Sequence, residues 1–134
     1  MFIRALKRLL GRDAYVQVFK NRIWVRNLDN GQTLDEAALQ PFSTTRLLVG
    51  DFEAAQRHLT GLFHRLYSKR IITPSPRVLI QAREQNEGGL SLVEKRVLLE
   101  LATVAGASDA FLHEGSELSD FAARELLANR GRDA

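Results

Sequence analysis

The polar loop from Arg83 to Gly89 is the stretch whose residue types come nearest to a ligand-binding pattern. It follows a predicted strand and precedes a predicted helix, the position at which α/β folds usually hold ligands. Its Gly88-Gly89 pair invites a phosphate-loop interpretation, but Glu84 and Glu87 would repel phosphate, and no Gly-Lys-Ser/Thr sequence follows. We interpret it as a charged connecting loop and predict no cofactor there.

Metal binding and nucleophilic catalysis need residue groups that this sequence does not bring together. His58 and His64 are six residues apart, which does not place them on one helical face, and His113 ends a predicted strand beside Glu114. The hydroxyl run Ser43-Thr44-Thr45 has no glycine elbow and no neighbouring histidine. We therefore predict no catalytic residue and no metal ligand.

Tyr15 and Trp24 are aromatic residues that could stack on bases, as they do in proteins that bind single strands. Such a surface needs a basic groove, yet residues 13–134 carry 15 basic and 16 acidic residues. Core packing is the better interpretation of both rings, and no nucleic-acid partner is expected. Salt-sensitive binding to DNA or RNA that disappears without residues 1–12 would favour the alternative.

The first twelve residues hold four basic residues and no acid, in a chain with a net charge of +3. On a helical wheel the apolar residues gather on one side and the basic residues on the other. The apolar side is Phe2, Ile3, Leu6, Leu9 and Leu10, and the basic side is Arg4, Lys7, Arg8 and Arg12. Such a helix could lie in an anionic membrane surface or meet a protein partner, and docking on its own domain would produce the same wheel.

At 134 residues the chain is long enough for one domain with a buried core. No apolar run approaches the roughly 20 residues that span a bilayer. The sequence has no cysteine and no secretory signal, which favours a cytoplasmic location. If residues 1–12 bind lipid, the protein would sit peripherally on the inner face of the membrane.

Alternating residues predict strands at 14–19 and 22–26, joined by a tight turn at Lys20-Asn21. Asp29-Asn30-Gly31 is a turn signal before a third strand between 32 and 40, so the chain begins as a three-stranded meander. Residues 41–49 are predicted as a loop. Asp51 then caps a helix. Its apolar face is Phe52, Ala55, Leu59, Leu62, Phe63 and Leu66.

A strand, crossover helix and second strand follow. The strands are predicted at 77–81 and 110–112, and a helix of this length makes them parallel. Ser91 and Glu94 form a capping box, and Gly106 supplies a left-handed stop. The apolar face predicted for this helix is Val93, Val97, Leu101 and Val104, with Leu98, Ala102 and Ala105 beside it.

A last helix is expected to start between Ser116 and Ser119 and to carry Phe121, Leu126 and Leu127. The predicted order is therefore βββαβαβα with an additional helix in front. We predict an α/β fold, a five-stranded mixed sheet with helices on both faces. The expected divisions are an amphipathic helix at 1–12, a single domain at 13–128 and a polar tail at 129–134.

That order is the core of the ribonuclease-H-like subdomain of actin-like ATPases, and four motifs resemble the first subdomain of the bacterial rod-shape protein MreB. They are Val49-Gly50-Asp51-Phe52-Glu53-Ala54, Pro74-Ser75-Pro76-Arg77-Val78-Leu79, Ser91-x-Val93-Glu94-x-Arg96, and Ala105-Gly106-Ala107 leading to Phe111-Leu112-His113-Glu114. The MreB family has similar helix and strand starts in the same order. Many of its members share a basic amphipathic N-terminus.

The sequence departs from that family where ATPase chemistry would lie. Actin-like ATPases carry an Asp-x-Gly-Thr turn between their first two strands, where glycine admits phosphate and the carboxylate helps to hold magnesium. The corresponding turn here is Gln17-Val18-Phe19-Lys20-Asn21, and only Glu114 remains of the family's Glu-Pro sequence after the last strand. The resemblance therefore implies a protein that is not an enzyme and has no cofactor.

The expected function is that of a non-catalytic MreB-like interaction module in bacterial cell-shape or envelope machinery. Its expected partner is a full-length actin-like protein or a second copy, with an anionic membrane as a further surface for residues 1–12. A degenerate nucleotide-binding or ATPase subunit completed by a partner chain is the first alternative, and a nucleic-acid binder is the second.

Overall fold

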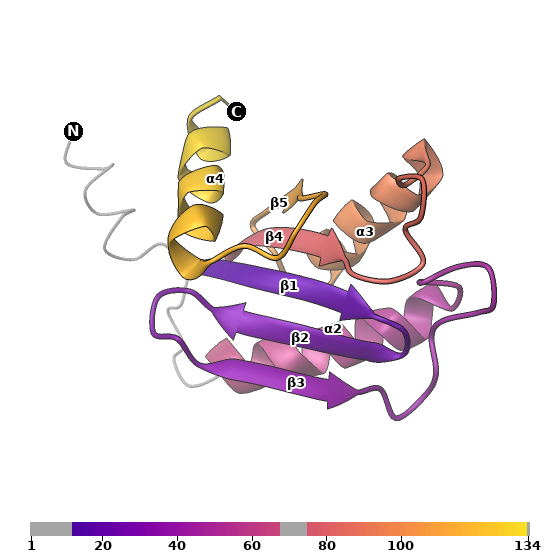
Figure 1. The fold of residues 1–134 in the computed structure, drawn as a ribbon. Coiled ribbons are helices and arrows are strands. Elements are labelled where there is room, and N and C mark those ends of the chain that lie inside the picture. The colour runs from indigo at the N-terminus through magenta and orange to yellow at the C-terminus, as the bar shows by residue number, and fades with distance from the viewer. Residues whose placement is uncertain (1–11, 68–74, 134) are drawn as a thin grey trace.

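The computed structural model describes residues 12–67 and 75–133, and within these ranges it contains a five-stranded mixed sheet and three helices (Figure 1). The elements are β1 Asp13–Phe19, β2 Arg22–Asn27, β3 Thr33–Ala37, α2 Phe52–Tyr67, β4 Arg77–Ala82, α3 Leu92–Val104, β5 Asp109–Leu112 and α4 Asp120–Asp133. This confirms the predicted order βββαβαβα. The additional helix predicted in front falls on residues 1–11, outside the described residues.

The strand order in the sheet is β3-β2-β1-β4-β5, with β1 at its centre. β2 pairs with β1 and β3 in antiparallel fashion, whereas β4 is parallel to β1 and β5 is parallel to β4. Both the meander and the parallel crossover are thus confirmed. Phe111 lies on the edge strand β5 and is only partly buried.

Alternate residues of the central strands divide the core between the two faces of the sheet. Val16 and Ile80 point to one face and pack in the larger cluster with buried residues of α2 and α3. Tyr15 and Leu79 point to the other face and pack against Leu127 of α4. Helices therefore cover both faces of the sheet, and among the described helices α2 and α3 lie on one face and α4 on the other (Figure 1).

Both ends of α3 form as predicted. The Ser91 hydroxyl accepts from the Glu94 N–H at 3.1 Å, and the Glu94 carboxylate accepts from the Ser91 N–H at 3.0 Å. At the other end Gly106 has φ 127°, and the N–H groups of residues 106 and 107 donate to the carbonyls of Thr103 and Ala102. This pair of bonds is a Schellman motif.

The predicted apolar face of α3 is wrong at two positions. The residues that α3 and its cap bury are Leu98, Leu101, Ala102 and Ala105. Val93 and Val104 are 70% and 42% exposed. A helical wheel shows which residues share a side of a helix, but it does not show which of two adjacent apolar stripes turns toward the sheet.

A second correction concerns the polar tail predicted at 129–134, because α4 continues to Asp133. Ser119 caps the start of the helix by accepting from the Ala122 N–H at 3.1 Å. Polar residues such as Asn129 are compatible with a helix, so composition alone could not locate its end. Ala134 lies outside the described residues.

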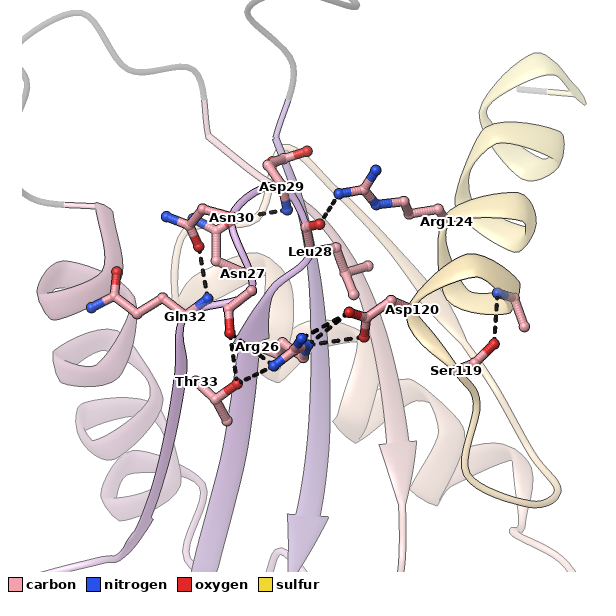
Figure 2. Close-up of polar contacts among 12 residues, drawn as sticks. Arg26, Asn27, Leu28, Asp29, Asn30, Gln32, Thr33, Ser119, Asp120 and Arg124 are labelled. Atoms are coloured by element: carbon pink, nitrogen blue, oxygen red, sulfur yellow. Dashed lines mark hydrogen bonds and ion pairs between the residues drawn. The ribbon is translucent and has the colours of Figure 1, made fainter.

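Contacts with the β2–β3 hairpin hold α4 in place, as Figure 2 shows. Arg26 of β2 makes a bidentate ion pair with Asp120 at 2.8–3.0 Å, and it also donates to Gly31 O and Thr33 Oγ1. One turn further along α4, Arg124 donates to the Leu28 carbonyl. The hairpin and the helix thus form one unit from residues about 100 positions apart.

Candidate interaction site

A buried polar cluster lies at the carboxyl ends of β1 and β4, where parallel sheets usually hold ligands. Gln17 and Gln81 are neighbours in register, and each is 1% exposed. The Gln17 amide nitrogen donates to Glu117 Oε2 at 2.9 Å, and its amide oxygen accepts from Arg83. Arg83 and Glu117 are 3.8 Å apart. The side chains of these two strand ends are therefore paired with each other and with the segment after β5.

The hydroxyl of Tyr15 completes this cluster. It donates to Gln81 Oε1 and accepts from the Leu118 N–H at 3.2 Å, while Gln81 Nε2 donates to the Gly115 carbonyl at 2.7 Å. Burial raises the pKa of Tyr15, so the hydroxyl stays protonated. The amides of Gln17 and Gln81 and the Tyr15 hydroxyl all form hydrogen bonds within the protein. Those of Tyr15, Gln17 and Gln81 hold residues 115–118 against the ends of β1 and β4.

The β1–β2 turn is filled by side chains. Asn21 has φ 55°, and its Oδ1 accepts from the N–H groups of Phe42 and Ser43 at 2.9 and 2.7 Å. The Phe19 ring lies beneath the guanidinium group of Arg22 at 4.0 Å. The positions that the MreB resemblance matches to a carboxylate and a glycine are thus occupied by the Gln17 amide and the Phe19 ring.

The loop at 83–89 has partners of its own. Asn86 donates to the Ala82 carbonyl at 2.9 Å, Gln85 donates to the carbonyls of Thr44 and Thr45, and the Glu84 carboxylate accepts from the Lys20 N–H. Gly88 and Gly89 adopt φ values of 73° and 89°. These glycines form the tight turn before α3, and the Gln85 amide connects the loop to residues 44–45.

Two of the three histidines, His58 and His64, lie on α2, and His113 directly follows β5. His58 Nε2 is 2.8 Å from the Glu36 carbonyl, and His113 Nε2 is 2.9 Å from the Ser116 carbonyl. His64 is exposed on α2. Within the described ranges no three side chains of His, Asp or Glu converge as metal ligands, and no helix has the length and hydropathy needed to cross a bilayer.

An apolar groove opens between residues 47–49 and the first half of α3, and we name it the α3 groove. Its lining residues are Leu47, Leu48, Val49, Ala82, Leu90, Val93, Glu94, Val97 and Leu98. Its volume is about 70 Å³, far below the roughly 300–1,000 Å³ of small-molecule sites. The groove is therefore the size of one or a few amino-acid side chains.

The α3 groove is the feature that sequence reasoning missed. The sequence feature that pointed to it is the apolar run Leu47-Leu48-Val49. These residues were predicted to form a loop, and they do form a loop. Leu47 is 44% exposed, and Leu92 and Val93 beside the groove are 79% and 70% exposed. Several large apolar side chains gathered on one surface indicate a contact site more strongly than single exposed ones.

The membrane or partner contact predicted at residues 2–12 is described only at Arg12. The other residues of that prediction, Phe2, Ile3, Arg4, Leu6, Lys7, Arg8, Leu9 and Leu10, lie outside the described residues. The Arg12 carbonyl accepts from the Arg77 N–H at 2.8 Å, and its guanidinium lies 5.4 Å from the Tyr67 ring centre. Arg12 is therefore attached to the sheet.

The sequence matches no model of a known protein family. It is 34% identical over 127 residues to a protein of Escherichia coli (strain K12) described as "Uncharacterized protein YjaA". That match covers 87% of this chain and 97% of the relative. The chain belongs to the YjaA family.

Among solved structures, this member of the YjaA family is similar to MreB5 of Spiroplasma citri bound to ADP, with a TM-score of 0.60 and 15% sequence identity. The similarity covers 78% of this chain but only 38% of the MreB5 chain. At this identity it shows the fold alone. The sheet and its helices thus resemble a subdomain of MreB.

Proposed function

We propose that this member of the YjaA family is a non-catalytic, MreB-like interaction module, a scaffold or regulator in bacterial cell-shape or envelope machinery. It binds a full-length actin-like filament protein or another copy of itself. It acts in the cytoplasm, and residues 1–12 add contact with a partner or with an anionic membrane surface.

The observation that carries this proposal is that side chains fill the edge of the sheet at the carboxyl ends of β1 and β4. An ATPase of the actin-like type needs open backbone and a carboxylate at this edge. Here Gln17 is buried and bonded to Arg83 and Glu117, and Phe19 fills the turn. Because the described residues leave no open phosphate site at this edge, the similarity to an MreB subdomain supports a binding role over catalysis.

Two further features support a protein partner. The α3 groove presents exposed apolar side chains, and its volume suits the side chains of another protein. The sequence of residues 1–12 adds five large apolar residues and four basic residues in an amphipathic pattern.

A pull-down from native bacterial extract tests the proposal, with the immobilised full chain as bait and a chain without residues 1–12 as the comparison. We expect recovery of an actin-like filament protein, or of an untagged copy supplied in the same extract. Recovery of neither one by either bait would contradict the proposal.

A degenerate nucleotide-binding subunit, completed by a partner chain, is the second candidate. The observation that favours it is the similarity of the fold to a protein whose structure holds ADP, although this chain spans 38% of that protein. Calorimetric titration of the full chain with ATP or ADP, with and without magnesium, separates the two candidates. We expect no magnesium-dependent binding, and a micromolar dissociation constant would favour the second candidate.

A further inference from the structure

The α3 groove has one wall made of a loop and the other made of a helix. Leu47 stands on the loop side, and Val93 and Val97 stand one helical turn apart on α3. Leu92, which precedes Val93 on α3, is exposed but is not a lining residue of the groove. An occupant with apolar side chains at helical spacing would place one row of them between these walls.

The charges around the groove define the chemistry of this occupant. The segments that form it, residues 46–53 and 84–100, carry six carboxylates and three basic side chains. An occupant with an apolar stripe and a basic opposite face therefore has favourable electrostatic interactions with the rim. Within this chain, the segment with that combination is 1–11, which carries Phe2, Ile3, Leu6, Leu9 and Leu10 beside Arg4, Lys7 and Arg8.

The sheet register argues against docking of this segment in the groove of its own chain. Arg12 precedes the start of β1, whereas Ala82 in the groove pairs with Val18 at the far end of β1. The six residue steps from Arg12 to Val18 correspond to about 20 Å at the rise of about 3.3 Å per residue in a strand. A ten-residue helix is about 15 Å long, so one that ends beside Arg12 cannot lay its whole apolar side in that groove.

We propose that the α3 groove binds residues 1–11 of a second copy of this chain. The inference deepens the proposed function, on which it rests, by naming the partner and the two surfaces. Two copies that exchange their N-terminal segments reciprocally form a two-fold dimer, whereas a groove that contacts the segment of the next copy gives a heterologous interface. Repetition of such an interface closes a ring or extends a filament.

The experiment uses the full chain with Leu6 replaced by the photoreactive amino acid p-benzoylphenylalanine. Equal amounts of unlabelled and ¹⁵N-labelled protein are mixed and irradiated, and the crosslinked peptides are identified by mass spectrometry. We expect crosslinks from position 6 to residues 46–50 or 90–98, with mixed-isotope pairs as frequent as same-isotope pairs. The yield should fall with added salt, because exposed charges contribute to the contact.

Val93→Lys and Val104→Lys form a matched pair of variants, because both valines are exposed on α3 and only Val93 lines the groove. Val93→Lys should lower the crosslink yield at least about tenfold, since it places a cation in an apolar contact that faces a basic segment. Val104→Lys should leave the yield within about twofold. Thermal unfolding followed by circular dichroism checks that both variants fold.

The inference is overturned if the crosslinked pairs all carry the same isotope, or if the crosslinks from position 6 reach other surfaces of the protein. A parallel sample contains anionic lipid vesicles, and crosslinks to lipid in that sample without any crosslinks to protein would also overturn it. Equal yields from the two lysine variants also overturn it. If the extract pull-down still recovers an actin-like filament protein in any of these cases, the proposed function stands while this inference fails.

Discussion

The Tyr15 hydroxyl ties β4 and the segment after β5 together through Gln81 and Leu118. Tyr15→Phe leaves the Gln81 oxygen and the Leu118 N–H without this partner, so we expect it to lower the free energy of unfolding by about 1–3 kcal/mol. Urea unfolding followed by circular dichroism measures the change.

Tyr67→Phe is the matched control for that variant. The Tyr67 hydroxyl is also buried, but among the described residues it has no hydrogen-bond partner. Removal of this hydroxyl should change stability by less than about 0.5 kcal/mol or raise it. Equal losses from the two tyrosine variants would contradict the role given to the Tyr15 hydroxyl.

Ile80 tests the core at the level of one side chain. Ile80 is a residue of β4, and its fully buried side chain packs against the helices α2 and α3. Ile80→Ala should cost about 2–5 kcal/mol, and Ile80→Val should cost about 0.5–1.5 kcal/mol, because the lost contacts scale with the atoms removed. Urea unfolding of both variants measures this series, and a loss below 1 kcal/mol for the alanine variant would place Ile80 outside a close-packed core.

At the scale of elements, Glu36 joins the edge strand β3 to α2 through a 2.6 Å ion pair with Arg65. The hydrogen bond from Arg65 lowers the pKa of Glu36 below its ordinary value. The folded state then binds a proton less readily than the unfolded state. The stabilisation is therefore present above the unfolded pKa of about 4.3 and is lost as the pH falls through the folded pKa.

Because the pKa of Glu36 is lowered in the folded state, we predict that Glu36→Gln lowers the melting temperature at pH 7 and has little effect near pH 3. Thermal unfolding across that range measures the difference between the two proteins. Glu100→Gln is a control on the exposed face of α3. A deficit for Glu36→Gln that grows as the pH falls would refute the prediction.

The start of α3 depends on the capping box of Ser91 and Glu94. Ser91→Ala removes the acceptor for the Glu94 N–H, so it should lower the free energy of unfolding by about 1 kcal/mol. Ser116→Ala, in the exposed segment after β5, should change it by less than about 0.5 kcal/mol. Chemical denaturation ranks the two, and the reverse ranking would show that the cap contributes little.

For the whole molecule, the question is whether the described domain is stable without its first segment. Among the described residues, the two core clusters form a complete two-sided core from Ala14 to Leu127. A chain that begins at Arg12 should therefore melt within about 2 °C of the full chain, a shift that corresponds to well under 1 kcal/mol. Differential scanning calorimetry at low protein concentration makes the comparison, and a loss of several degrees would mean that residues 1–11 belong to the core.

The sequence by itself determined the elements and their order, since these depend on local signals. Alternation marked β1 and β2, Ser91 with Glu94 marked the start of α3, and Gly106 marked its end. The crossover length made β4 and β5 parallel. Local residues carry these signals because caps, turns and periodicity act over a few positions.

Tertiary structure alone decided which apolar stripe of α3 faces the sheet and where polar side chains meet. Val93 was predicted to lie on the apolar face that packs on the sheet. It is instead exposed, and it lines the α3 groove together with Leu47. Arg26 and Asp120 are 94 residues apart and form an ion pair. Neither result could come from local patterns, because each depends on how separate elements pack and on which side chains this packing brings within contact distance.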